Sequence, residues 1–299
     1  MVMDNTRISY VDASWSPVRG CSPAGVGCAF CFAAAVASRF NTGPFAGLAS
    51  GGRWTGTPRF VPEQLEVPLC WKRPRRILTP TMGDVFHPAI AAADVVSIFE
   101  VMAVSERHTF LSLTKRPERM AEVLYGESGR WYLGGGDYLP NVWPGTSVST
   151  QADVDRAVPA LLSTGIGWHY WLSVEPLLER VNLAACWLPR IEGSRVEFVV
   201  VGGESGPHAR PCEVGWIRDV VRQCREAGVP VWVKQMGSNI VDQTENYRAW
   251  GGSYPHGKWY GVLPSNTELG RVRLVSRAGA DMAEWPEDLC VREMPEGWR

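Results

Sequence analysis

Three cysteines lie within eleven residues near the start of the chain. Cys21, Cys28 and Cys31 have the spacing C-x6-C-x2-C, in a loop that also holds glycines and a proline. Glycine permits the sharp turns that would bring three thiolates to one point. Thiolates grouped in this way bind zinc or an iron–sulfur cluster. The loop therefore predicts a metal centre, with a metal-free loop as the remaining alternative.

The number of cysteines favours one kind of metal centre. A closed zinc site takes four ligands, and a fourth could come only through the fold, from His87 or His208. A cubane cluster on three cysteines instead leaves one iron open to a small molecule. Radical S-adenosylmethionine (SAM) enzymes hold their cofactor in this way, and Cys28-x2-Cys31 with Phe30 before the last cysteine resembles their motif. The first gap is longer than their usual C-x3-C.

Polar side chains follow short β-rich segments at intervals of 28 to 32 residues, about the length of one βα unit. They are Asp84, Lys115, Ser147, Glu175, Glu204 and Lys234. Apolar residues recur at helical spacing between the segments, as in 95–102, 154–162 and 217–224. This alternation predicts a parallel sheet, either doubly wound or closed as a barrel.

A barrel would bring these polar residues together, because the carboxyl ends of its strands converge on one mouth. The Cys loop follows the first predicted strand, Arg7–Val11, and is expected at the same mouth. One polar residue after a strand often only begins a loop or caps a helix. Six in succession favour a shared site.

An ordered series of stretches carries a resemblance to a known family. They are Trp15–Cys21, Gly27–Cys31, Met82–His87, Leu113–Met120, Asn141–Trp143, Leu172–Leu178, Val201–Gly206 with Ala209–Pro211, Val233–Gly237 and Glu284–Leu289. Through them the sequence resembles the phage-encoded radical-SAM-like proteins long filed as of unknown function, the phage gp thirty-seven/sixty-eight family. The resemblance implies an α/β fold, a partial or near-complete radical SAM-type, TIM-like (β/α) barrel with parallel strands. Residues 1–238 would form the barrel, and residues 239–299 an extension that packs on it or closes it within a single structural domain.

On the radical SAM hypothesis, individual residues receive roles from their positions and chemistry. Cys21, Cys28 and Cys31 would bind three irons of a [4Fe–4S] cluster, and SAM would chelate the fourth. The residues expected to bind the cofactor are Phe30, Met82, Gly83, Asp84, Ser147 and Ser149. Those expected to be catalytic are Lys115, Glu175, Glu204, Lys234 and Gln235, and those expected to face the substrate are Arg116, Glu175 and Lys234.

The sequence departs from the family pattern in two places. The family commonly has a tyrosine after the third cysteine, where this chain has Phe32, so any role of that hydroxyl is absent. Radical SAM enzymes place a Gly-Gly-Glu-like turn after the second strand to hold the SAM amino group. Here that position is Met82-Gly83-Asp84, whereas the literal Gly202-Gly203-Glu204 falls four units later. We therefore give the amino-group role to Gly83 and Asp84 by position.

The function implied by the resemblance is that of a radical SAM enzyme, which cleaves SAM and abstracts hydrogen from its substrate. The substrate expected from the family is a thymine-derived base carrying an amino-acid adduct, modified or isomerised in phage DNA hypermodification. Partners would be DNA or a modified nucleotide and an electron donor such as flavodoxin or ferredoxin. Basic residues at 72–76, with Lys115, Arg116 and Arg119, could contact phosphates.

Three alternatives stay open. The chain could be a radical SAM lyase that reverses a DNA lesion, or a radical SAM enzyme acting on a small molecule or peptide. It could also be a non-catalytic, zinc-stabilised nucleic-acid-binding protein. Metal content and cleavage of SAM distinguish these classes.

Composition limits the class of protein further. A formal charge of −1 excludes a generally basic nucleic-acid coat, although a local basic groove is permitted. No apolar run approaches the roughly 20 residues of a membrane span, and no signal peptide is evident. We expect no membrane partner and a cytoplasmic location, in the host cytoplasm if the chain is phage-encoded. Cysteines there stay reduced, and five are expected to be inert: Cys70, Cys186, Cys212, Cys224 and Cys290.

Overall fold

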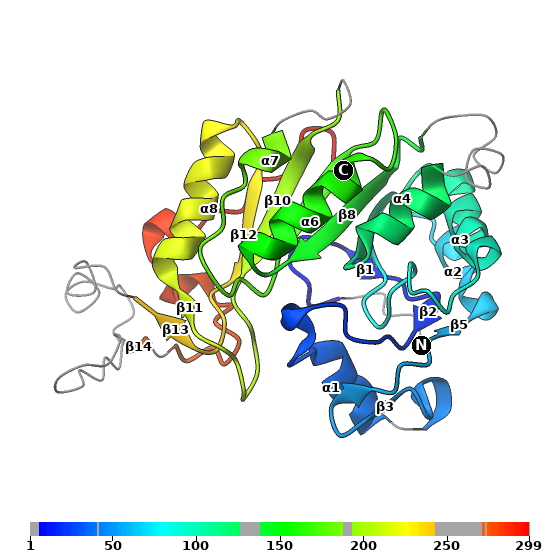
Figure 1. The fold of residues 1–299 in the computed structure, drawn as a ribbon, viewed down its shortest axis with the longest axis horizontal. Helices are drawn as coiled ribbons and strands as arrows, with labels where there is room; N and C mark the ends of the chain where they lie inside the picture. Colours follow the sequence, from blue (N-terminus) through cyan, green and yellow to red (C-terminus); the bar gives the residue numbers. More distant parts are fainter. Residues whose placement is uncertain are drawn as a thin grey trace.

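A seven-stranded parallel sheet forms the centre of the computed structural model (Figure 1). The structure describes residues 6–40, 42–125, 138–187, 193–242, 271–272 and 274–298. The strands, in spatial order, are β1 (Ala13–Ser14), β6 (Arg76–Thr79), β7 (Thr109–Thr114), β8 (Val142–Val148), β9 (Tyr170–Val174), β10 (Val196–Gly202) and β12 (Val231–Gln235). Every neighbouring pair is parallel. All strand ends that carry the polar residues therefore lie at one edge.

Helices connect the strands and cover one face of the sheet (Figure 1). They are α3 (Ala92–Val104), α4 (Pro117–Tyr125), α6 (Gln151–Leu162), α7 (Ala184–Trp187) and α8 (Val214–Glu226). The three predicted helical stripes fall in α3, α6 and α8. Thr150 caps α6 by accepting a hydrogen bond from the Asp153 N–H at 3.2 Å. Pro159 lies inside α6, which continues to Leu162.

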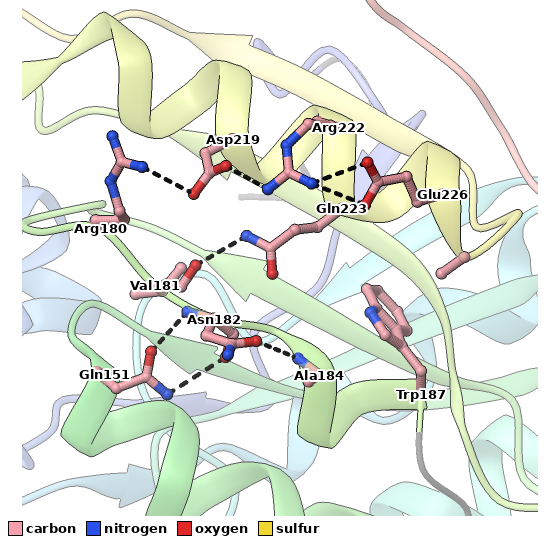
Figure 2. A pocket seen from close by; sticks show the side chains of 11 residues that line it. Gln151, Arg180, Val181, Asn182, Ala184, Trp187, Asp219, Arg222, Gln223 and Glu226 are labelled. Atoms are coloured by element: carbon pink, nitrogen blue, oxygen red, sulfur yellow. Dashed lines mark hydrogen bonds and ion pairs between the residues drawn. The ribbon is translucent and has the colours of Figure 1, made fainter.

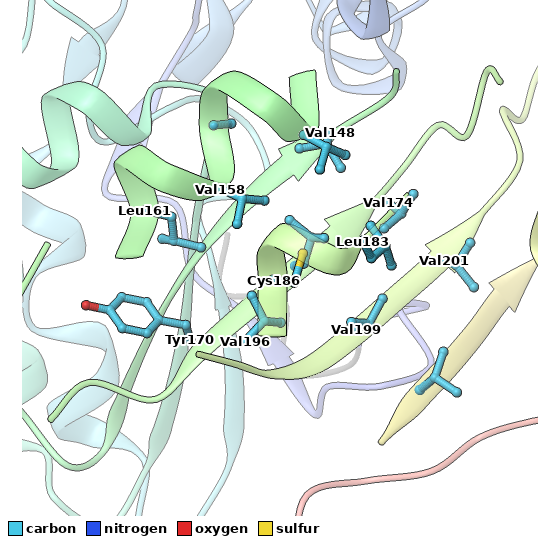
Figure 3. Close-up of a cluster of buried hydrophobic side chains, with 14 of the residues drawn as sticks. Val148, Val158, Leu161, Tyr170, Val174, Leu183, Cys186, Val196, Val199 and Val201 are labelled. Atoms are coloured by element: carbon cyan, nitrogen blue, oxygen red, sulfur yellow. The ribbon is translucent and has the colours of Figure 1, made fainter. Parts of the chain in front are cut away.

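Successive residues of each strand are buried on opposite faces of the sheet. On the helical side, Val199 and Val201 of β10 join the cluster in Figure 3, where Val158 and Leu161 of α6 and Cys186 of α7 meet the strands. Burial of each such side chain contributes roughly 1.5–3 kcal/mol. The other face holds a second apolar cluster: Tyr10, Val11, Leu78, Leu111, Trp143, Trp171, Phe198, Val200 and Trp232.

The sheet curls around this second cluster. Trp232 of β12 donates from Nε1 to the Ser9 hydroxyl at 3.1 Å. The edge strand β12 therefore contacts the segment just before β1, which is the edge strand on the other side of the sheet. Among the described residues β1 and β12 do not pair with each other. The fold is thus a partial (β/α) barrel with parallel strands, which confirms the predicted fold class.

The first strand differs from its prediction. Residues Arg7–Val11 form a turn closed by the Val11 N–H and the Ile8 carbonyl, and β1 begins at Ala13. Tyr10 and Val11 are apolar enough to suggest a strand, but they are buried in the second cluster from this turn.

Shorter elements lie between β1 and β6 in the sequence, and the first of them surround the Cys loop on one flank of the barrel (Figure 1, blue). They are β2 (Val18–Arg19), η1 (Val26–Cys28), α1 (Phe32–Arg39), η2 (Gly43–Phe45), β3 (Ala49–Ser50), β4 (Arg53–Trp54), β5 (Arg59–Phe60), η3 (Pro62–Gln64) and α2 (Val67–Cys70). Two antiparallel pairs, β2 with β5 and β3 with β4, fasten this flank.

The C-terminal residues pair with the edge of the barrel. The Val233 N–H donates to the Val291 carbonyl at 2.9 Å, and the Trp298 ring contacts Trp143 and Phe198 of the inner cluster. The remaining elements are β11 (Cys212–Glu213), β13 (Ile240–Val241), β14 (Arg271–Val272), η5 (Met282–Glu284) and η6 (Glu287–Leu289). None of the helices in the described ranges is both long and apolar enough to cross a membrane.

Candidate functional site

A cavity of about 760 Å³ opens at the carboxyl ends of the strands. The Cys loop, the start of α1 and the strand ends all contribute to its wall. It brings together nearly all of the residues predicted for the site: Cys21, Cys28, Phe30, Cys31, Gly83, Asp84, Lys115, Arg116, Ser147, Glu175, Glu204, Lys234 and Gln235. Met82 and Ser149 lie outside the lining.

The three thiols are free and half-buried at this cavity. Burial raises the pKa of Cys21 to about 11, with Asp84 adding to the rise and Arg116 opposing it. Among the described residues, no three His, Cys, Asp or Glu side chains could together hold a single metal ion. Three thiols on one cavity are a donor set that zinc and iron–sulfur clusters both use.

Arg116 fastens the first cysteine to the strand ends. Its guanidinium donates to Asp84 Oδ2 at 2.7 Å, to the Ser22 carbonyl at 2.8 Å and to Cys21 Sγ at 3.5 Å. Thr114 Oγ1 and the Phe86 N–H hold the other Asp84 oxygen. The Asp84 carboxylate thus holds Arg116 and, through it, the loop, and it also lines the cavity.

His87 completes this network. The Ala89 N–H donates to Nδ1 of His87 at 3.1 Å, and Nε2 lies 2.8 Å from the Ser22 hydroxyl. With Nδ1 accepting, the proton of the neutral ring sits on Nε2 and points to Ser22. Burial lowers the pKa of His87, and the Arg116 charge lowers it further. The neutral ring is therefore favoured.

Lys115 brings a second cation to the other two thiols. Its Nζ donates to the Ser147 hydroxyl at 2.5 Å, and that hydroxyl donates to the Glu175 carbonyl at 2.8 Å. Burial lowers the pKa of Lys115, while Cys28 is foremost among the groups that oppose this effect. Lys115 and Arg116 together would offset the negative charge of three thiolates, so the residues present fit an anionic iron–sulfur centre.

Two glycines allow the Cys loop to lie against the strand ends. A Cβ on Gly27 would stand 2.2 Å from Ser149 Oγ, and one on Gly83 would stand 2.6 Å from the Val18 carbonyl oxygen. The Gly20 N–H also donates to the Met82 carbonyl at 3.0 Å. Met82 and Ser149 thus support the loop, and neither lines the cavity.

Arg210, which the sequence analysis did not single out, holds the Cys loop from the far side. It donates to both Glu204 oxygens, from Nη2 to Oε1 at 2.6 Å and from Nε to Oε2 at 2.9 Å. A further donor, Nη1, reaches the Val26 carbonyl at 2.8 Å, and the guanidinium lies over the Phe30 ring. Glu204 therefore positions Arg210.

An ion pair of opposite charges faces the cavity from β9 and β12. Lys234 Nζ lies 3.0 Å from Glu175 Oε1, and both residues line the wall. Tyr10 joins them, although sequence reasoning missed it. Burial and the nearby Glu175 raise its pKa well above the ordinary value.

A family model described as "Protein of unknown function (DUF5131)" matches residues 5–270. The chain belongs to the DUF5131 family. A comparison with curated proteins finds no match.

The DUF5131 chain is also similar in fold to two solved structures of spore photoproduct lyase. One, a cysteine-to-serine mutant, is 9% identical and has a TM-score of 0.43. The match covers 91% of this chain and 71% of the lyase chain. The other, a tyrosine-to-phenylalanine mutant, is 10% identical with a TM-score of 0.41 and the same coverage.

A second hollow of the DUF5131 protein, of about 720 Å³, lies between α6, α7 and α8 (Figure 2). Its polar side chains bind one another or nearby backbone. Gln223 donates to the Val181 carbonyl at 2.9 Å, Gln151 accepts from the Asn182 N–H at 2.6 Å, and Arg222 pairs with Asp219 and Glu226. The Gln223 bond holds the segment after β9 against α8, and the Gln151 bond holds it against α6, whereas both Arg222 pairs lie within α8.

Proposed function

We propose that this DUF5131 protein is a radical SAM enzyme. The observation that carries the proposal is that Cys21, Cys28 and Cys31 line the same cavity as two half-buried basic residues, Lys115 and Arg116. The three thiolates would hold a [4Fe–4S] cluster, with SAM in the adjoining cavity. When bound, this pair supplies a one-electron cleavage of SAM that yields a radical able to take hydrogen from a substrate.

The chain's own residues would position and screen this chemistry. Arg116, held by Asp84, fixes the Cys21 end of the loop and brings positive charge to the thiolates. Arg210, held by Glu204, fixes the Val26 end and covers Phe30. The two arginines therefore hold the loop from opposite sides.

For the substrate we infer a DNA base carrying an amino-acid-like adduct, modified or isomerised in DNA hypermodification. The support is the Lys234–Glu175 pair on the cavity wall, since a group with an ammonium and a carboxylate could exchange partners with these two side chains. In such an isomerisation the attachment of the adduct would move from nitrogen to carbon. One hydrogen atom would be taken from the substrate and one given back, so the mass of the base would not change. We infer flavodoxin or ferredoxin as the electron donor.

Iron content of single cysteine variants tests the metal centre. Protein purified without oxygen should carry iron and sulfide, and Cys21→Ala, Cys28→Ala and Cys31→Ala should each lose most of both. Cys70→Ala and Cys290→Ala are matched controls, because these two cysteines are exposed and do not line the cavity. Full iron in all three loop variants, or zinc in place of iron, would refute the proposal.

Lys234→Met tests the substrate assignment separately. The variant leaves the cluster ligands untouched and should retain wild-type iron, but it removes the cation that pairs with Glu175. Conversion of adducted DNA, followed by chromatography of the nucleosides, should fall by at least an order of magnitude. Unchanged conversion would exclude the ion pair from substrate binding.

A further inference from the structure

One flank of the cavity is free of acidic residues over a long stretch of sequence. From Ala13 to Pro62 the chain contains four arginines and no Asp, Glu, Lys or His, although the whole chain has a formal charge of −1. The arginines are Arg19, Arg39, Arg53 and Arg59. We call these residues, 13–62, the arginine flank. It comprises the Cys loop, α1 and the two small antiparallel pairs (Figure 1).

Two of these arginines lie opposite each other. Arg19 and Arg59 are partners in the antiparallel pairing of β2 with β5. Like charges directly opposite in such a pair are destabilising. Glu63 attracts Arg19 from nearby, but neither arginine forms an ion pair with any residue that the structure describes. Arg19 packs over the Phe45 ring, and Arg59 donates to the Ala46 carbonyl at 3.5 Å.

Arg53 carries the same charge into the cavity. A two-residue loop joins β3 to β4, and both of its glycines have positive φ, +56° at Gly51 and +76° at Gly52, as type I′ hairpins require. The Gly52 N–H donates to Ser38 Oγ at 2.9 Å and fastens the hairpin to α1. Arg53 and Trp54 then line the cavity, with Arg53 exposed.

We propose that the arginine flank binds the phosphate backbone of a DNA strand whose base enters the cavity. The inference rests on the proposed function, for which it names the surface that holds the substrate. All four cations are arginines, whose planar fork matches phosphate oxygens. Trp54 offers a face on which a base can stack beside Arg53.

The position of Arg53 and Trp54 favours DNA over an acidic electron-donor protein. Both residues line the cavity itself, where a protein partner cannot enter but an extruded nucleotide can. The basic cluster at 72–76, by contrast, lies at the amino end of β6, the edge of the sheet opposite the cavity. That cluster could not guide a base into this site.

The test is DNA binding by the full-length, iron-loaded protein, measured by fluorescence anisotropy with a labelled single-stranded oligonucleotide at several salt concentrations. Arg53→Gln and the double variant Arg19→Gln/Arg59→Gln should each weaken binding by roughly 3–10-fold. Each lost phosphate contact should also lower the slope of log K against log salt by about 0.7. Arg222→Gln on α8, where the arginine is paired with two carboxylates, is the matched control and should bind as the wild type does.

Three results would overturn the proposal: wild-type affinity and salt slope in both arginine variants, tighter binding of RNA than of DNA, or unchanged DNA binding with slower reduction by flavodoxin. The last would assign the flank to an acidic protein. Formation of 5′-deoxyadenosine by the wild type is scored separately. If no 5′-deoxyadenosine forms, the radical SAM function is refuted and the DNA-binding result still stands. If it forms but the arginine variants bind DNA as the wild type does, only the role of the arginine flank is refuted.

Discussion

Arg116 holds Asp84 in an ion pair of 2.7 Å, and only 14% and 6% of the two side chains remain exposed. The same guanidinium reaches Cys21 and Ser22. The carboxylate predicted to bind the SAM amino group thus pairs with the arginine that contacts the first cysteine.

Asp84→Asn tests the importance of this pair. The substitution keeps the shape of the side chain but leaves the Arg116 charge buried without its counterion, so the free energy of unfolding should fall by about 3 kcal/mol. Urea denaturation of the iron-free chain measures this independently of the cluster. Glu226→Gln, in an exposed pair, should have no measurable effect. Equal stability of Asp84→Asn and the wild type would show that the ion pair does not hold the loop.

Gly27→Ala tests the close approach of the Cys loop to β8. The added Cβ would stand 2.2 Å from Ser149 Oγ, so the loop must shift, at a cost of roughly 1–3 kcal/mol, with loss of iron. Ser149→Ala alone should be nearly neutral, because this hydroxyl has no hydrogen-bond partner among the described residues. Combining the two should recover part of the stability and iron lost in Gly27→Ala.

Gly25→Ala is the control for that pair. Its backbone is extended, and the nearest atom to an added Cβ is 3.6 Å away. Iron loading should stay at the wild-type level. Equal losses in Gly25→Ala and Gly27→Ala would attribute the effect to loop flexibility in general and contradict the contact with Ser149.

Arg210→Gln tests the outer support of the loop. Without the bond to the Val26 carbonyl, the loop should expose the cluster, and the iron–sulfur absorbance should decay several-fold faster in air. Arg210→Lys should not restore the wild-type rate, because one ammonium cannot span both Glu204 oxygens and the Val26 carbonyl. Arg225→Gln, in an exposed pair with Glu293, is the control. A decay rate that Arg210→Gln leaves unaltered would remove Arg210 from this role.

The depressed pKa of His87 predicts how stability depends on pH. The unfolded chain, with an ordinary histidine pKa of about 6.5, binds a proton more readily than the folded one, so stability rises with pH up to about 6.5. Protonation would also cost the bond from the Ala89 N–H. Denaturation of the iron-free chain at a series of pH values should show a smaller slope for His87→Gln than for the wild type. Burial also lowers the pKa of His108, and this histidine contributes equally to the pH dependence of stability in both proteins. Identical slopes would contradict a neutral, bonded His87.

The strand positions and the lining of the cavity could be predicted from sequence because both follow from regular spacing. One strand end every βα unit places Lys115, Ser147 and Glu175 on a common edge whatever the details of the loops. Ser149 lies outside the lining because β8 ends at Val148 and the Ser149 hydroxyl lies close to Gly27. Beyond Val148 the alternation of side chains along a strand no longer predicts which way a residue faces.

The remaining parts of the site depend on contacts between distant segments. Arg210 binds Val26 across 184 residues, and Tyr10 reaches the neighbourhood of Glu175 only because the sheet curls. No local pattern reports such contacts. The arginine flank did have a signal in the sequence, the absence of Asp and Glu between Ala13 and Pro62, but its nearness to the cavity is visible only in the fold.

Formation of 5′-deoxyadenosine tests the central claim most directly. Protein purified and reconstituted with iron and sulfide in the absence of oxygen would be reduced with dithionite and incubated with SAM, with and without adducted DNA. The wild type should release 5′-deoxyadenosine, and Cys28→Ala should release none. If the reduced, fully iron-loaded wild type forms no 5′-deoxyadenosine under either condition, this DUF5131 protein is not a radical SAM enzyme.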